Sequence, residues 1–193
     1  MSVHQQPELK AAILALPDRA KDKLLIRLIN KDKMLIKRLH FELLEDETDL
    51  QARVEHLRRQ LQTLFVDAAK SMASNTSLNS IIAVNKLVRH ANGIINEHEK
   101  VTKDKISEVE FRLLILKELI QRFSQIVEVS HLQASHKLHQ YLAARIKFAY
   151  GKWLKLHEDY QFDFRDELQL IITWGSNSAL SPYLRQYNIP MEI

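Results

Sequence analysis

The sequence predicts an all-α protein, in which three short N-terminal helices precede an antiparallel bundle of long helices. Turn-forming residues are scarce, because the 193 residues include only three glycines and four prolines. Aliphatic residues also recur at alternating steps of three and four, which is the spacing of one face of an α-helix. An α-solenoid, a HEAT-like stack of helix pairs, is the alternative fold. The lack of any repeat at a fixed period counts against it.

The first 46 residues form a basic segment in which we expect three short helices. Pro7 suits the first turn of one helix, and Pro17 follows the end of that helix. Asp18 is a good N-cap for the second helix, which Asn30 ends. Leucines of the third helix repeat every four residues, at Leu35, Leu39 and Leu43.

Residues 47–193 are predicted to form the bundle, either as a second domain or as part of one continuous domain. The apolar spacing predicts four long helices, over about 48–72, 77–99, 103–129 and 131–160. Capping-box patterns at Thr48-x-x-Gln51 and Ser130-x-x-Gln133 predict two of the helix starts. Short connections make sequence neighbours antiparallel, and three-four spacing favours packing at about 20°.

The sequence does not fix the secondary structure near two of the glycines. Asn92-Gly93 is either a turn that splits a helix or a tolerated glycine against a close neighbour, and the continuous apolar face favours the second. A last helix is expected over about 163–174, with Gly175 as its C-terminal cap. The tail after it is expected to be irregular or a short helical turn.

Positive charge is concentrated near the N-terminus. Residues 10–40 hold nine Lys or Arg against three Asp, whereas residues 41–193 hold 19 Lys or Arg against 20 Asp or Glu. Like charges one helical turn apart destabilise a helix by a few tenths of a kcal/mol, so an anionic partner such as a phosphate backbone would relieve a cost. A solvated basic face is the competing interpretation. The candidate nucleic-acid-binding residues are Arg19, Lys23, Arg27, Lys33, Lys37 and Arg38.

Aromatic residues are concentrated near the other end, since ten of the 14 Phe, Trp and Tyr lie after residue 140. Exposed, they would form a protein-binding or dimer surface, because Trp and Tyr dominate interface hot spots. Buried, they would fill the joint where the last helix folds back on the bundle. The candidate interface residues are Trp153, Trp174, Tyr183 and Tyr187.

One group of residues is compatible with a metal site. Glu128-x-x-His131 has the spacing that di-iron bundles use, and His136 and His139 follow closely. Such bundles need a second Glu-x-x-His motif, and this sequence has none. A metal at Glu128, His131, His136 and His139 is therefore the least favoured interpretation, and we expect no cofactor.

Enzyme signatures are absent from the sequence, which has no nucleophile elbow, P-loop, dinucleotide fingerprint or His-Glu-x-x-His. The zero cysteines exclude thiolate chemistry. No apolar run approaches the roughly 20 residues of a membrane span, and the start lacks the basic region of a signal peptide. We therefore expect a soluble, cytoplasmic, non-enzymatic module that binds a protein partner or self-associates. Nucleic-acid binding through the basic N-terminal helices is the alternative.

Overall fold

A computed structural model of the chain describes residues 2–72 and 77–193. It is 81% helical, and its described residues contain no β-strand, which confirms the all-α fold class. The chain divides into two compact units, Met1–Glu45 and Asp46–Ile193.

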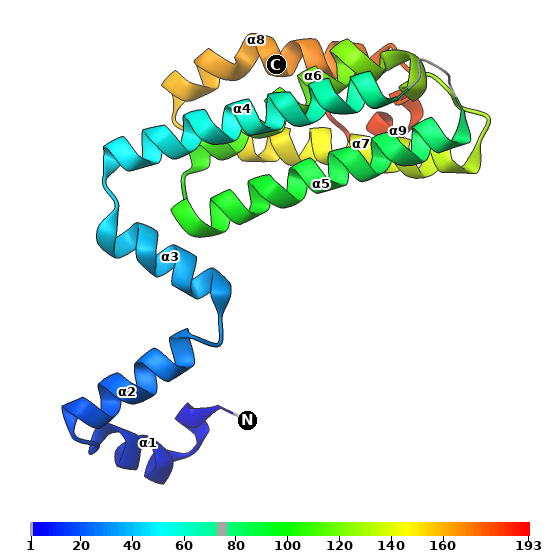
Figure 1. Ribbon diagram of the computed structural model, residues 1–193. Helices are drawn as coiled ribbons and strands as arrows, with labels where there is room; N and C mark the ends of the chain where they lie inside the picture. The colour runs from blue at the N-terminus through cyan, green and yellow to red at the C-terminus, as the bar shows by residue number, and fades with distance from the viewer. Residues whose placement is uncertain (1, 73–76) are drawn as a thin grey trace. The chain divides into compact units, whose positions relative to one another are not determined.

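The N-terminal unit consists of short helices. A 3₁₀ turn at Val3–Gln5 is followed by α1 (Pro7–Leu14), α2 (Asp18–Ile29) and α3 (Lys33–Leu44) (Figure 1). Asp32 caps α3, because its carboxylate accepts hydrogen bonds from the backbone N–H groups of Met34 and Leu35, at 2.9 and 3.1 Å. Asp18 is the first helical residue of α2 rather than its predicted N-cap, a position that Pro17 occupies.

Helices α1, α2 and α3 contain no buried residue. Isolated helices shorter than about 12–15 residues are marginal in water, and most helical stability in proteins comes from packing an apolar face. The described residues of the N-terminal unit therefore lack a core of their own. Its exposed large apolar residues are Val3, Leu9, Leu14, Leu25, Ile26, Leu28, Ile36, Leu43 and Leu44.

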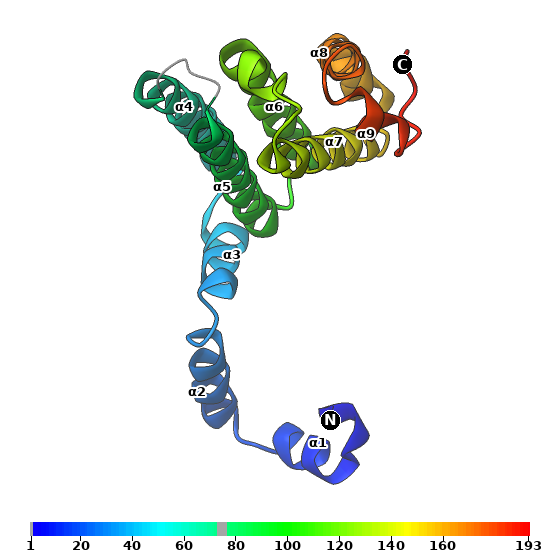
Figure 2. The same ribbon diagram turned by 90° about the vertical axis from the view of Figure 1, so that its right-hand side faces the viewer.

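The second unit is built from long helices, and successive helices run in opposite directions (Figure 1). Helix α6 packs against α4, α5, α7 and α8, and Figure 2 shows it between the α4–α5 pair and α8. The core accordingly centres on α6, whose buried side chains include Phe111, Leu113, Leu116 and Leu119. The helices are α4 (Glu47–Ser71), α5 (Leu78–Thr102), α6 (Lys105–Val127), α7 (Gln133–Trp153), α8 (Glu158–Ser176) and α9 (Ser181–Arg185).

The predicted helix over 131–160 is wrong at its end, because α7 stops at Trp153 and α8 begins at Glu158. The indole Nε1 of Trp153 donates to the carbonyl of Gln161 at 2.9 Å, and Gln161 Nε2 donates to the carbonyl of Leu156 at 2.9 Å. These bonds hold the turn between the two helices. Leu156 is buried within this turn, so the apolar spacing continues across a break in the helix.

Several predicted helix ends also differ. The capping box of α4 uses Asp46 and Asp49 instead of Thr48 and Gln51, and Leu132 precedes α7 without a side-chain cap. Gly175 lies inside α8, so it is not the predicted C-terminal cap.

The glycine at position 93 lies within a continuous α5, as expected, but not for the expected reason. A Cβ atom added at Gly93 would have no atom of a neighbouring element within 4 Å, so no close packing requires glycine there. The same holds for Gly151. The glycine that allows a close approach is Gly175, where an added Cβ would lie 2.7 Å from Leu184 Cδ1 of α9.

Candidate functional site

The predicted basic residues of α2 form an exposed stripe. Arg19, Lys23 and Arg27 lie one helical turn apart, and the described residues provide none of them with an ion pair or hydrogen bond. Leu24 and Leu28 directly follow Lys23 and Arg27, so an apolar strip adjoins the stripe along the helix. We call Arg19, Lys23 and Arg27 the basic edge of α2.

The basic residues of α3 are less available than those of α2. Arg38 Nε donates to Glu42 Oε1 at 2.6 Å, so a carboxylate on the same helix balances its charge. Lys37 also has an interaction partner. Lys33 is exposed in the first turn of α3 and forms no ion pair with a described residue. The exposed positive charge of the predicted set is therefore concentrated on α2.

An exposed face of α8, which was not among the predicted sites, carries the opposite charge. Asp159, Asp163 and Asp166 share this face with Phe162 and Leu170, at successive steps of three and four. Phe162 is 77% exposed, the highest exposure of any large apolar side chain in the described ranges. Asp163 and Asp166 have no ion pair with a described residue, whereas Asp159 lies 3.2 Å from His157 Nδ1.

These five α8 residues form what we call the acidic face of α8. Figure 2 shows α8 at the far side of α6 from the α4–α5 pair, at the edge of this unit. The signal was present in the sequence, because acidic and apolar residues alternate with helical spacing between positions 159 and 170. Because the helix was predicted to start only near residue 163, Asp159 and Phe162 were not placed on it.

The predicted interface aromatics fill the joint between α7, α8 and α9 instead of forming an exposed patch. Trp153 is only 7% exposed and stacks on Tyr150, with ring centroids 5.9 Å apart. Trp174, Tyr183 and Tyr187 are half-buried and pack against the core. Because these side chains hold the C-terminal elements together, they offer little area to a partner.

Three of the four candidate metal ligands are engaged elsewhere, and the fourth, His131, is exposed. His139 Nε2 donates to the carbonyl of Val127 at 2.6 Å, and His136 Nδ1 shares a hydrogen bond of 2.5 Å with the hydroxyl of Tyr183. A carboxylate oxygen of Glu128 accepts from the backbone N–H of Ala179 at 3.2 Å. Among the residues that the structure describes, no group of three or more His, Cys, Asp or Glu could hold a metal ion.

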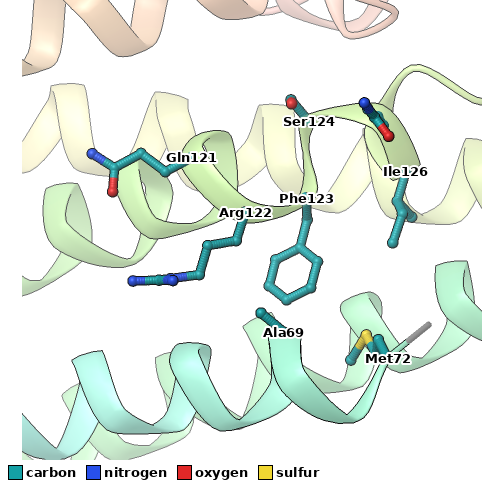
Figure 3. Close-up of a pocket in the computed structure, with 8 residues that line it drawn as sticks. Ala69, Met72, Gln121, Arg122, Phe123, Ser124 and Ile126 are labelled. Atoms are coloured by element: carbon teal, nitrogen blue, oxygen red, sulfur yellow. The ribbon is translucent and has the colours of Figure 1, made fainter. Parts of the chain in front are cut away.

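A pocket of about 260 Å³ lies between the end of α4 and the C-terminal half of α6. Figure 3 shows the ring of Phe123 and the side chain of Ile126 directed from α6 toward Ala69 of α4 and Met72, the residue that follows α4. Arg122, the one charged residue in the described part of its lining, donates to Glu118 at 2.6 Å. A pocket with this lining offers no pair of acid and base groups, so we assign it no catalytic role.

Comparisons with known proteins find no match, whether among protein families, curated proteins or solved structures. Over residues 2–72 and 77–193, no helix combines the length and apolar character that crossing a membrane requires.

Proposed function

We propose that this chain is a non-enzymatic protein-interaction module, and that it assembles by docking α2 of one copy on α8 of another. The observation that carries the proposal is that α1, α2 and α3 bury no side chain. Short amphipathic helices of this kind gain stability when another surface covers their apolar face.

Exposed apolar and charged groups favour the acidic face of α8 as the covering surface. Leu25, Ile26 and Leu28 of α2 are each more than half exposed, as are Phe162 and Leu170 of α8. Covering these side chains removes apolar area from water, which contributes roughly 25 cal/mol per Å². The neighbouring charges are opposite in sign, so they give the contact its orientation and specificity.

Charge also argues against pairing two N-terminal units with each other. Residues 1–45 hold nine Lys or Arg and six Asp or Glu, so two such units repel. Residues 158–167 of α8 hold five Asp or Glu and one Arg. A contact between α2 of one copy and α8 of another either forms twice in a two-fold dimer or repeats head to tail in closed rings or open chains.

The test is light scattering coupled to size-exclusion chromatography of the full chain, over a hundredfold range of protein concentration. We expect mass to rise with concentration, and to fall when salt screens the charged contact. Two charge-reversal variants, Arg19→Glu/Lys23→Glu/Arg27→Glu and Asp163→Lys/Asp166→Lys, should each be monomeric. Lys70→Glu/Lys100→Glu/Lys155→Glu, which reverses three exposed charges outside both surfaces, should assemble like the parent chain.

Mixing the two variants makes the test specific to this pair of surfaces. Each variant retains one native surface, so in a mixture the native α2 of one variant can dock on the native α8 of the other. The reversed α2 and the reversed α8 also carry opposite charges, so they can pair as well. We expect the mixture to form complexes that neither variant forms alone. A chain that is monomeric at every concentration, or a mixture that stays monomeric, would refute the proposal.

Nucleic-acid binding is the second candidate function, and the exposed, unpaired basic edge of α2 is the observation that favours it. Fluorescence anisotropy with labelled duplex DNA and single-stranded RNA at two salt concentrations tests it. Under this alternative, Arg19→Glu/Lys23→Glu/Arg27→Glu loses binding, whereas Asp163→Lys/Asp166→Lys does not. Absence of binding at low salt would end this candidate and leave the protein contact unaffected.

A further inference from the structure

The second unit contains a buried polar network where α5, α6 and α7 meet. Arg112 and Glu108 of α6 have side chains that are 4% and 1% exposed, and Arg112 Nε donates to Glu108 Oε1 at 3.0 Å. The other guanidinium nitrogens donate to the amide oxygens of Asn92 and Asn96 on α5, at 3.0 and 2.9 Å. Lys152 of α7 donates to the second oxygen of Glu108 at 2.7 Å.

Three cationic groups surround the ring of Phe148 on α7. The guanidinium carbons of Arg112 and Arg145 lie 4.5 and 5.2 Å from its centroid, and Lys152 Nζ lies 5.3 Å from it. Cations near an aromatic face gain attraction from the ring quadrupole, which helps to hold them together. Glu108 is the only carboxylate bonded to this group within the described chain, and both Arg112 and Lys152 already use it.

Arg145 is the cation that has no hydrogen-bond partner among the described residues. Its Nε is buried and has no hydrogen-bond acceptor among the described residues, although a buried donor left unpaired is costly. The rings of Phe148 and Tyr141 hold its guanidinium, each at 5.2 Å. Arg89 of α5 lies over the same Tyr141 ring at 4.0 Å, and its Nε is positioned by Asn85 Oδ1 at 2.9 Å.

Positive charge is in excess around the rings of Tyr141 and Phe148. Of the four cations there, Arg89, Arg112, Arg145 and Lys152, only Arg112 and Lys152 bond to a described carboxylate, that of Glu108, so three positive charges are in surplus. Helix α7 contains no Asp or Glu, and those of α5 lie only in its last turns, at Glu97 and Glu99. We call Arg89, Tyr141, Arg145, Phe148 and Lys152 the α5–α7 face.

We propose that the α5–α7 face binds a ligand with two or more linked phosphate groups. Arginine forks match phosphate oxygens, and Arg145 carries donors that no described side chain or carbonyl accepts. A phosphate carries about −1.5 to −2 at pH 7, so two linked groups match the surplus charge. Tyr141 and Phe148 are seven residues apart, about 10 Å along the helix, so the cations extend beyond the size of one phosphate.

Each residue has a defined part in this site. The phosphate oxygens are bound by Arg89, Arg145 and Lys152. Arg112 has a different part, because its guanidinium is already bonded to Glu108 and Asn92. It positions the ring of Phe148. The site uses residues outside α2 and α8, so it stands or falls independently of the proposed assembly.

Isothermal titration calorimetry of the full chain with tripolyphosphate, orthophosphate and ATP tests the proposal. We expect tripolyphosphate to bind at least tenfold more tightly than orthophosphate. Equal affinity for ATP means that the phosphate chain alone is recognised, and a higher affinity for ATP means that the nucleoside adds contacts. Either result supports the site, whereas no heat of binding from tripolyphosphate at millimolar concentration would overturn it.

Substitutions test whether the residues of the α5–α7 face bind tripolyphosphate. Arg89→Gln/Arg145→Gln should weaken tripolyphosphate binding at least tenfold. Lys147→Gln/Lys155→Gln, which removes two charges from another face of α7 and the turn after it, should change affinity less than twofold. If Arg89→Gln/Arg145→Gln does not fold, Arg145→Lys replaces it as the test. This variant keeps the charge but loses the guanidinium fork, so it should bind tripolyphosphate measurably more weakly than the parent chain. Equal affinity in the variants and the parent chain would refute the assignment.

Discussion

At the scale of single residues, the most informative contact is the Arg112–Glu108 pair in the interior of the second unit. Burying two charges costs several kcal/mol per ion, and the loss is recovered only when every polar atom finds a partner. Asn92, Asn96 and Lys152 provide those partners. The pair therefore depends on three helices being in place together.

Removing one member of this pair should be more harmful than removing both. Arg112→Leu leaves the Glu108 carboxylate buried with Lys152 alone, and we expect it to lower the free energy of unfolding by about 3–5 kcal/mol. Arg112→Leu/Glu108→Leu should recover most of this loss, because Lys152 can then reach water. Urea unfolding of both variants and the parent chain measures the difference. A double variant no more stable than Arg112→Leu would contradict the argument.

Two histidines make stability depend on pH. Burial is the main cause that lowers the pKa of His98 and of His139 below the usual 6.5, so the folded chain holds both rings neutral. The unfolded chain binds protons first as pH falls, and the free energy of unfolding should therefore decrease below about pH 6.5.

Urea unfolding at pH 7.5 and at pH 5.5 measures this dependence. His98→Gln/His139→Gln removes both titrating rings, so its stability should change less between the two pH values than that of the parent chain. His131→Gln, at an exposed position, is the matched control and should leave the dependence unchanged. An equal pH dependence in all three chains would contradict the assignment to His98 and His139.

At the scale of helices, the periodicity of apolar residues identified the long elements of the second unit, whereas their ends depended on local bonds. Asp104 begins α6 by accepting from the N–H groups of Ile106 and Ser107, a cap that the expected start near residue 103 did not assign. The hydrogen bond from the Trp153 indole to the carbonyl of Gln161 ties the end of α7 to the first turn of α8. The spacing of apolar residues alone does not show where a helix ends when the turn after it also places a buried side chain in the core.

The three glycines should respond differently to alanine, because only one has a close neighbour. Gly93→Ala and Gly151→Ala meet open space inside α5 and α7, so each should stabilise the chain by about 0.5–1 kcal/mol. Gly175→Ala brings a methyl group 2.7 Å from Leu184 Cδ1 and should be less stable than both. Thermal unfolding ranks the variants, and a Gly175→Ala chain as stable as Gly93→Ala would show that Leu184 yields freely.

At the scale of the whole molecule, the second unit is nearly neutral, but its charges are unevenly distributed among its helices. Residues 46–193 hold 19 basic and 18 acidic residues. Yet α7 contains no acidic residue and the start of α8 is strongly acidic. Both functional proposals rest on this separation, since one uses the acidic face of α8 and the other uses the α5–α7 face.

The two units should also differ in how they exchange backbone hydrogens. Amides of residues 7–44 should exchange fast in dilute solution, because α1–α3 bury no side chain, and those of α6 should exchange slowest. If α2 docks on a second copy, protection of residues 18–29 rises with protein concentration. Hydrogen exchange followed by mass spectrometry at two concentrations measures this, and slow exchange throughout residues 7–44 in dilute solution would contradict it.

The sequence by itself determined the helical fold class, because few turn-forming residues and three-four apolar spacing are local properties of the chain. It also determined the basic edge of α2, whose residues are neighbours on one helix. Only the tertiary structure decided that Trp153 is buried, that Arg145 has no hydrogen-bond acceptor among the described residues, and that Arg89 and Arg145 share the ring of Tyr141. These facts depend on which helices pack together, and contacts between residues far apart in sequence are not encoded in local spacing.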